Sequence, residues 1–180
     1  MMSGMGPVLV PSEDIQAKVR ELGEQITGDF RSENVLLVGI LRGAVVFLSD
    51  LMRHLELPCE IDFMEVSSYG TGTQSSGVVR IIKDLEEDIT GRHVLIIEDI
   101  IDTGLTLSYL RRTLLQRKPA SLEICALLSK PLRRQVELDV KYLGFEVPDE
   151  FVIGYGIDYA GAYRNLPDIR ALIKEEVARA

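Results

Sequence analysis

Residues 94–106 read VLIIEDIIDTGLT. The first four residues are apolar and largely β-branched, which predicts a strand buried on both faces. The carboxylates Glu98, Asp99 and Asp102 follow this run, and a helical pattern begins at Leu105. A strand, an acidic turn and a helix in this order place polar groups at the carboxyl end of a strand. Open α/β sheets bind their ligands there, so this stretch is the candidate site.

Small residues complete the turn between the strand and the helix. Gly104 lets the backbone approach a ligand closely, and Thr103 and Thr106 add hydroxyl groups on either side of it. The free N–H groups at the start of a helix can hold a phosphate. Three carboxylates beside such a phosphate site favour a functional role over a simple acidic loop with a helix cap.

Two further stretches have the same character. The sequence GILRG at residues 39–43 follows an apolar run and places Arg42 between a predicted strand and helix, an arrangement that suits an anion. The sequence FVIGYGIDY at residues 151–159 is interrupted by glycines, and YRNLP follows at residues 163–167. On residues alone, the first could be an ordinary strand-to-helix turn and the second an ordinary strand.

Together, the three stretches resemble the type I phosphoribosyltransferase family, and the EDIIDTG form is similar to its hypoxanthine-guanine branch. The resemblance extends over roughly residues 35–165. It implies an α/β fold with a mostly parallel central sheet flanked by helices. It also implies one domain over residues 1–180, with a core at about 35–145. The N-terminal segment and about 147–180 would form a small hood over the base.

The resemblance implies which residues bind phosphoribosyl pyrophosphate. They lie in the three stretches and are Leu41, Arg42, Gly43, Glu98, Asp99, Asp102, Thr103, Gly104, Leu105, Thr106 and Arg164. Several relatives carry Lys at the position of Leu105, so this chain lacks one possible phosphate contact. In relatives, the peptide bond between Leu41 and Arg42 can be cis.

The resemblance also implies a purine site, formed by Ile100, Lys130, Phe151, Val152 and Asp158. Lys130 would bind the exocyclic oxygen of a 6-oxopurine, while Phe151 stacks on the ring and Val152 offers backbone groups to its edge. An ammonium group can only donate hydrogen bonds and would oppose the amino group of adenine. Hypoxanthine or guanine is therefore the expected base, with xanthine as the closest competitor.

The implied reaction displaces pyrophosphate from carbon 1 of phosphoribosyl pyrophosphate by a purine nitrogen, through an oxocarbenium-like transition state. Asp102 would act as the catalytic acid or base at purine N7. Glu98 and Asp99 would face the ribose hydroxyls, and these two residues with Asp158 would hold Mg²⁺. The metal also explains how a chain of net charge −8 binds a highly anionic substrate.

A long polar segment, SSYGTGTQSSG at residues 67–77, lies between two predicted strands. Such a segment in a compact domain is more often functional or mobile than idle. By resemblance it is a lid that closes over the site, with Ser68 and Tyr69 as its functional pair.

Composition limits the remaining choices. A chain of 180 residues with 46% hydrophobic and 27% charged residues is typical of one soluble globular domain. The acidic balance argues against nucleic-acid binding, and no apolar run has transmembrane length, so a cytoplasmic protein is expected. Cys59 and Cys125 lie in apolar segments and are expected to be buried free thiols. Relatives form dimers and tetramers, so a homodimer or homotetramer is expected.

The sequence also bears on two other classes of protein. A non-catalytic, nucleotide-sensing regulator of the same fold is disfavoured by the acidic balance and by the intact set of Asp102, Lys130, Phe151 and Asp158. A dinucleotide-binding oxidoreductase would need a G-x-G-x-x-G pattern after the first strand, and residues 39–43 do not have it.

Outside these stretches, periodicity predicts a helix capped by Ser12 and ended by Gly28, and a second helix over residues 44–55. Residues 171–180 could form a terminal strand or a short helix, and the sequence does not decide between them.

Overall fold

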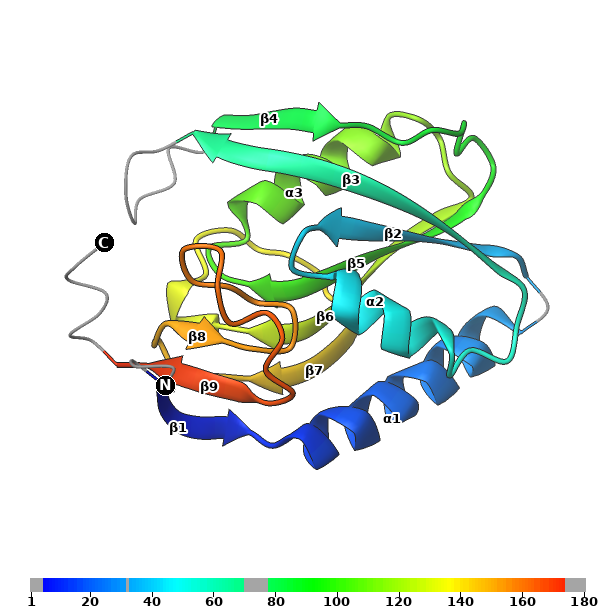
Figure 1. Cartoon of the computed structure of the whole chain (residues 1–180). Coiled ribbons are helices and arrows are strands. Elements are labelled where there is room, and N and C mark those ends of the chain that lie inside the picture. The colour runs from blue at the N-terminus through cyan, green and yellow to red at the C-terminus, as the bar shows by residue number, and fades with distance from the viewer. Residues whose placement is uncertain (1–4, 32, 70–77, 174–180) are drawn as a thin grey trace.

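A computed structural model describes residues 5–31, 33–69 and 78–173 of the chain, and its main sheet has six strands (Figure 1). Their order is β4-β3-β2-β5-β6-β7. All neighbouring strands are parallel except β3 and β4, which confirms the predicted α/β class. The strands are β2 (Val35–Leu41), β3 (Cys59–Tyr69), β4 (Val78–Lys83), β5 (His93–Ile101), β6 (Ser121–Ser129) and β7 (Tyr142–Glu146).

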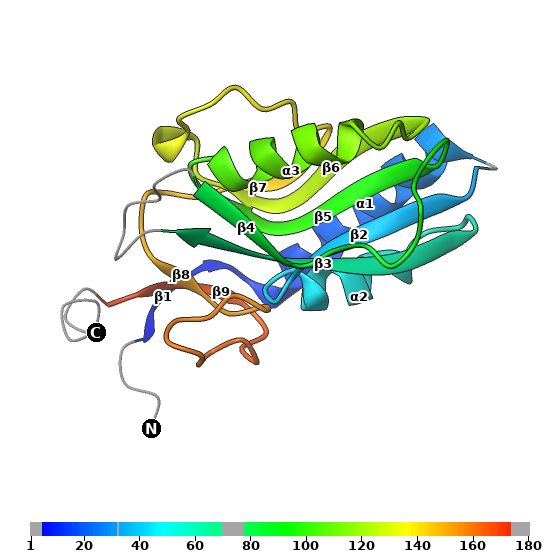
Figure 2. The same cartoon turned by 90° about the horizontal axis from the view of Figure 1, so that it is seen from above.

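Helices cover both faces of this sheet (Figure 2). The helix α3 (Leu105–Leu115) lies on one face, and α1 (Ser12–Phe30) and α2 (Val45–Met52) lie on the other. Successive residues of a strand point to opposite faces, so the continuous apolar runs supply both core layers. Leu37 and Leu95 pack with α1 and α2, whereas their neighbours Leu36 and Val94 pack with α3.

A second, small sheet joins segments from both ends of the chain. Its order is β1-β9-β8, with β1 (Met5–Val10) and β8 (Val152–Ile153) each antiparallel to β9 (Ile169–Leu172). It lies on the side of the molecule to which the parallel strands of the main sheet point (Figure 1). From the N-terminal segment only β1 joins this sheet, because α1 packs against α2 and β7.

The first helix differs from its predicted bounds. Ser12 is the first helical residue and does not cap the helix, because Pro11 occupies the N-cap position without a side-chain hydrogen bond. Gly28 does not end the helix, which continues to Phe30. Glycine inside a helix costs about 1 kcal/mol, and burial of the Phe30 side chain offsets this cost.

Three other boundaries also shift. The second helix ends at Met52 rather than at residue 55. Strand β5 continues to Ile101, so Glu98 and Asp99 belong to a strand and not to a turn. This extension follows from pairing with β6, in which Glu98 lies opposite Ala126.

Strand β3 runs to Tyr69, so the predicted lid pair Ser68 and Tyr69 belongs to a strand. The rest of that predicted lid, residues 70–77, lies outside the described residues. The choice left open for residues 171–180 is answered at its start, since Leu172 belongs to β9, whereas residues 174–180 are not described.

Both cysteines are free, as predicted, but only Cys125 is buried, whereas Cys59 is half-buried. In the described part of the chain, no helix combines the length and the apolar character needed to span a membrane.

Phe47 of α2 is fully buried between the helix and the sheet, so its replacement should leave a cavity. We expect Phe47→Ala to lower the free energy of unfolding by about 3–5 kcal/mol, measured by urea denaturation. Val45→Ala in the same helix is the matched control, because Val45 is 42% exposed and its loss should change that free energy by less than about 0.5 kcal/mol. Equal effects of the two substitutions would contradict this packing.

Candidate active site

The candidate site lies where β2 and β5 run side by side and their connections leave in opposite directions. Ligands of open α/β sheets bind at such a switch point. A cavity of about 260 Å³ opens there. Its lining includes seven of the residues expected at the site, namely Leu41, Glu98, Ile100, Asp102, Thr103, Gly104 and Thr106. Four residues that were not predicted for the site, Ile40, Val66, Ile101 and Leu107, complete its wall.

The turn after β2 rests directly on the end of β5. A Cβ atom added to Gly43 would lie 1.6 Å from Oδ2 of Asp99, so any side chain at this position would have to displace that carboxylate. The peptide bond between Leu41 and Arg42 is cis. The Arg42 side chain is 75% exposed, and its nearest carboxylate is Glu65 at 3.8 Å.

Glu98 and Asp99 form an electrostatically crowded pair. Burial, with the Asp99 carboxylate beside it, raises the pKa of Glu98 well above its usual range. Burial also raises the pKa of Asp99, although hydrogen bonds from Glu98 and from the backbone N–H of Ile100, at 2.7 Å, oppose this shift. Two such groups favour a shared proton or a nearby cation over two free negative charges.

The turn after β5 opens the N-terminus of α3 towards the cavity. Gly104 occupies the N-cap position with a φ of 81°, which favours glycine, and no side chain caps the helix. The Leu105 N–H makes only a long contact of 3.4 Å with the Thr103 hydroxyl. The first N–H groups of α3 have no partner within the helix and can therefore hold an anion.

Asp102 lies at the start of this turn and is paired with a residue that the sequence reasoning missed. Nε of Arg133 lies 2.8 Å from Oδ1 of Asp102, as an ion pair rather than an aligned hydrogen bond. The same guanidinium lies 3.4 Å from Asp149. The only available signal was that Arg133 follows Lys130 by three residues beyond the end of β6.

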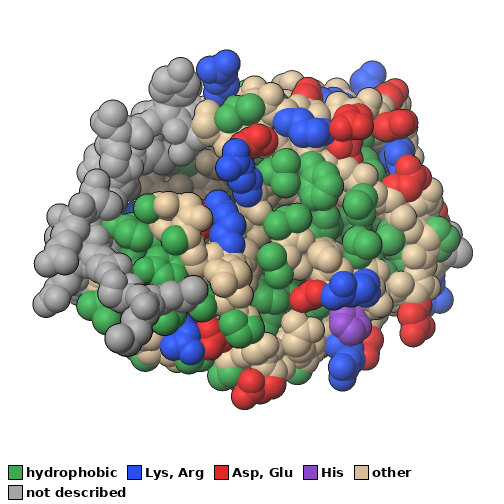
Figure 3. All heavy atoms as spheres, viewed as in Figure 1, with side chains coloured by type: hydrophobic (Ala, Val, Ile, Leu, Met, Phe, Trp, Pro, Cys, Tyr) green, Lys and Arg blue, Asp and Glu red, His purple; other side chains and the backbone are tan. Residues whose placement is uncertain are grey.

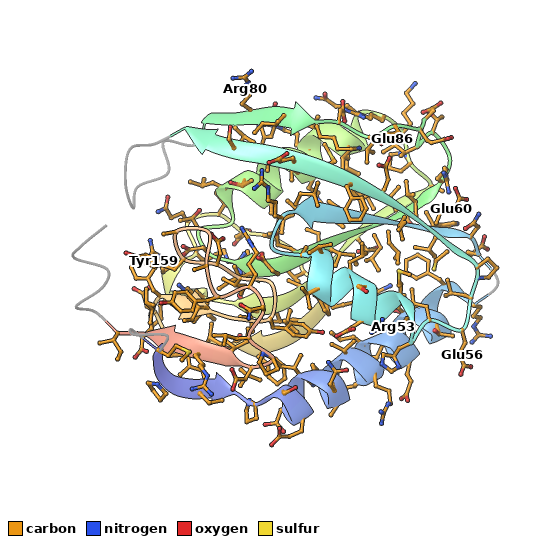
Figure 4. The ribbon with its side chains drawn as sticks, viewed as in Figure 1. Arg53, Glu56, Glu60, Arg80, Glu86 and Tyr159 are labelled. Atoms are coloured by element: carbon orange, nitrogen blue, oxygen red, sulfur yellow. The ribbon has the colours of Figure 1, made fainter. Side chains whose placement is uncertain are left out.

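Lys130 follows β6, and only 6% of its surface is exposed. Burial lowers the pKa of its ammonium group, and the charge of Asp102 opposes that shift. Its Nζ lies 5.8 Å from the centre of the Phe151 ring, which is 40% exposed. The Phe151 ring packs edge to face against the ring of Tyr159, with the two centroids 6.5 Å apart. Tyr159 is labelled in Figure 4. Beside Phe151, Val152 is buried within the small sheet.

Arg164 and Asp158 pair with each other, with 2.6 Å between Nη2 and Oδ1. Oδ2 of Asp158 accepts a hydrogen bond from the Gly161 N–H at 2.8 Å. Both oxygens of Asp158 are thus engaged. Among the residues that the structure describes, no cluster of three or more His, Cys, Asp or Glu side chains is placed to hold a metal. The three expected magnesium ligands are therefore not brought together as one set.

Comparison with known proteins identifies the class. The profile of the family described as "Phosphoribosyl transferase domain" matches residues 10–160. The chain belongs to this family, which confirms the resemblance predicted from its motifs. Hypoxanthine phosphoribosyltransferase of Haemophilus influenzae is 54% identical over 172 residues, covering 94% of this chain and 96% of that protein.

Two further relatives agree with this assignment. Hypoxanthine-guanine phosphoribosyltransferase of Bacillus subtilis is 52% identical over 165 residues, with 92% of each chain covered. The crystal structure of a hypoxanthine phosphoribosyltransferase from Staphylococcus aureus superimposes with a TM-score of 0.93 at 48% identity, covering 98% of each chain.

The contact between Gly43 and Asp99 generates a prediction about stability. Gly43→Ala must displace the Asp99 carboxylate, so we expect the free energy of unfolding to fall by about 1–3 kcal/mol, measured by urea denaturation. Gly28→Ala is the matched control, because nothing lies within 4 Å of its added Cβ. That substitution should instead stabilise α1 by about 0.5–1 kcal/mol. A Gly43→Ala protein as stable as the wild type would show that this approach is not close.

Proposed function

We propose that this protein transfers the 5-phosphoribosyl group from phosphoribosyl pyrophosphate to hypoxanthine or guanine, giving IMP or GMP and pyrophosphate in purine salvage. The observation that carries the proposal is the position of Lys130. This buried lysine lies beside Asp102, next to the phosphate-binding turn at the start of α3. A donor for a 6-oxopurine and a cradle for a sugar phosphate are thus adjacent. Membership of the family and the names of the relatives support the same reaction.

In the proposed reaction, the turn from Asp102 to Thr106 holds the 5′-phosphate with N–H and hydroxyl groups. The purine nitrogen attacks carbon 1 as pyrophosphate leaves, and Asp102 accepts or shares the proton at N7. Arg133 pairs with the Asp102 carboxylate at 2.8 Å, so a purine would have to compete with this ion pair. On the leaving-group side, Arg42 and Arg164 would face the pyrophosphate.

The base would lie between Phe151 and the end of β5. Stacking on an exposed aromatic ring provides affinity without strong selectivity, whereas the Lys130 ammonium group only donates hydrogen bonds. That group accepts a purine with an oxygen at C6 and opposes an amino group there. Ile100 and Val152 would complete the purine site.

We propose Mg²⁺ as the cofactor. Mg²⁺ prefers oxygen ligands and commonly binds through one or two carboxylates plus substrate phosphates, and Glu98 with Asp99 offers such a pair. Asp158 is engaged by Arg164 and would act through water. When bound, the metal would neutralise charge on the pyrophosphate.

A homodimer or homotetramer in the cytoplasm is part of the proposal. Hydrophobic side chains gather on the face seen in Figure 3, and Met52 of α2 and Ile61 of β3 are each more than a third exposed. Such exposure supports association between copies of the chain. The net charge of −8 supports small-molecule substrates and not nucleic acid as partners.

The direct test is steady-state turnover with phosphoribosyl pyrophosphate, Mg²⁺ and each of hypoxanthine, guanine, xanthine and adenine. Formation of IMP or GMP at enzymatic rates supports the proposal. Faster turnover of xanthine than of both other 6-oxopurines would point to the xanthine-preferring relatives. The absence of product from all four bases would refute it.

Lys130 should set the preference for 6-oxopurines. Replacing Lys130 with Ser should raise KM for hypoxanthine and guanine by at least ~10-fold, because a charged donor is lost, and should narrow the gap to adenine. Lys141→Ser is the matched control. Lys141 lies just before the first residue of β7, away from the site, where it pairs with Asp29, so its loss should leave these KM values unchanged. If Lys130→Ser still excludes adenine and uses hypoxanthine normally, Lys130 does not read the base.

Asp102 should be the proton-transfer residue. Asp102→Asn keeps the shape of the side chain but cannot take a proton, so turnover should fall by at least ~10²-fold. Binding of phosphoribosyl pyrophosphate without purine, measured by calorimetry, should change little. Asp149→Asn is the control, because it removes the other carboxylate that pairs with Arg133. Near-normal turnover of Asp102→Asn would exclude this role, and loss of substrate binding would assign Asp102 to building the phosphate turn.

A further inference from the structure

Tyr155 is a buried residue that the proposed reaction does not use. It lies in the turn after β8, between Gly154 and Gly156, and only 4% of its surface is exposed. Its φ is 46°, a backbone conformation that residues with a side chain rarely adopt. Its N–H donates a hydrogen bond to the carbonyl of Leu166 at 2.8 Å. The backbone of Tyr155 is thus fixed in an unusual conformation that directs its side chain into the protein.

The Tyr155 hydroxyl connects this turn to α2. It donates a hydrogen bond to Oδ2 of Asp50 at 2.6 Å. The same carboxylate accepts a hydrogen bond from Gln16 of α1 at 3.1 Å and pairs with Arg53, which lies at the end of α2 (Figure 4). Burial, together with the hydrogen bond to Asp50, raises the pKa of Tyr155 well above its usual range, so the hydroxyl remains a donor. One carboxylate therefore joins α1, α2 and the turn.

The next residue of this turn touches the loop expected to hold pyrophosphate. A Cβ added to Gly156 would lie 2.3 Å from the carbonyl oxygen of Gly43, so the two backbones are in direct contact. The Gly156 carbonyl also accepts a hydrogen bond from Nη1 of Arg164 at 2.6 Å. Gly43 leads directly into α2, which carries Asp50. The Tyr155 hydrogen bond and the Gly156 contact thus tie the same two elements together at two points.

We propose that Tyr155 is a positioning residue for the pyrophosphate side of the site. Its hydrogen bond to Asp50 clamps the turn onto α2 and so fixes Arg164 relative to the loop of Arg42 and Gly43. The inference rests on the proposed function, because it names the subsite that the clamp serves. The purine side has its own supports in β6 and the small sheet, so loss of the clamp should affect the two substrates differently.

The test is Tyr155→Phe, which removes only the hydroxyl. We expect KM for phosphoribosyl pyrophosphate to rise at least ~5-fold, because a hydrogen bond to a charged group is lost. The dissociation constant of pyrophosphate with Mg²⁺, measured by calorimetry, should rise in parallel. KM for hypoxanthine should stay within about twofold, since the hydroxyl bonds Asp50 of α2 and not a residue of the proposed purine site.

Tyr142→Phe is the matched control. The Tyr142 hydroxyl also donates to a carboxylate, Asp29, at 2.7 Å, and the Tyr142 ring is likewise buried. That pair joins β7 to α1, and Tyr142 begins β7, at the end away from the site. Both variants should lose a similar amount of thermal stability, but only Tyr155→Phe should weaken pyrophosphate binding. If both variants change KM alike, or if Tyr155→Phe raises both substrate KM values equally, the hydroxyl is merely structural and the inference fails.

Asp50→Asn is the second variant, and it decides the question if Tyr155→Phe does not fold. Asparagine still accepts the hydrogen bond from the hydroxyl but carries no charge, so KM for phosphoribosyl pyrophosphate should rise, by less than ~5-fold, while KM for hypoxanthine should not. An unchanged value would overturn the inference. Failure of the proposed function is distinguishable, because the wild-type protein would then form no nucleotide. If only the inference fails, the wild-type protein is active, but Tyr155→Phe does not change KM for phosphoribosyl pyrophosphate more than KM for hypoxanthine.

Discussion

The contact between Gly43 and Asp99 is the constraint on which the candidate site depends. Parallel pairing of β2 and β5 brings two strand ends together, and the turn after one strand must then pass over a carboxylate of the other. A side chain at residue 43 would meet this carboxylate and displace it. The same loop receives a second close approach from Gly156, whose backbone lies directly against the carbonyl of Gly43. Backbone N–H groups, carboxylates and guanidinium groups gather around this junction, and their chemistry suits the phosphorylated sugar of the proposed reaction.

The sequence predicts the central strand and helix because the pattern that specifies each of them lies within one short segment. The apolar run that begins at Val94 can be satisfied only by burial on both faces, and the pattern from Leu105 to Leu115 has helical spacing, so both were predicted correctly. Element ends were less predictable, because they depend on partners distant in the chain. Glu98 stays in β5 because β6 pairs with it, and Gly28 stays in α1 because Phe30 finds a place in the core.

The same distinction holds within the candidate site. The acidic turn and its glycine were visible because chemistry and spacing coincide within one short stretch. Arg133 was missed because its relation to Asp102 exists only after β6 has placed the two residues together. The hydrogen bond between Tyr155 and Asp50 was missed for the same reason, since the two residues are 105 positions apart in the sequence. Interactions between side chains far apart in sequence leave no periodic signal.

The small sheet that joins β1, β9 and β8 has a consequence for the order in which the molecule folds. Closing so long a loop costs conformational entropy and adds few contacts until the surrounding surface exists, so this sheet should form after the main one. The turn proposed to hold a phosphate, at the start of α3, belongs to the early part, whereas Phe151 and Val152 belong to the late part. On the proposed function, a folding chain would complete the turn for the sugar phosphate, and Lys130 at the end of β6, before the ring on which a base would stack, so affinity for the base would be the last property that the molecule acquires.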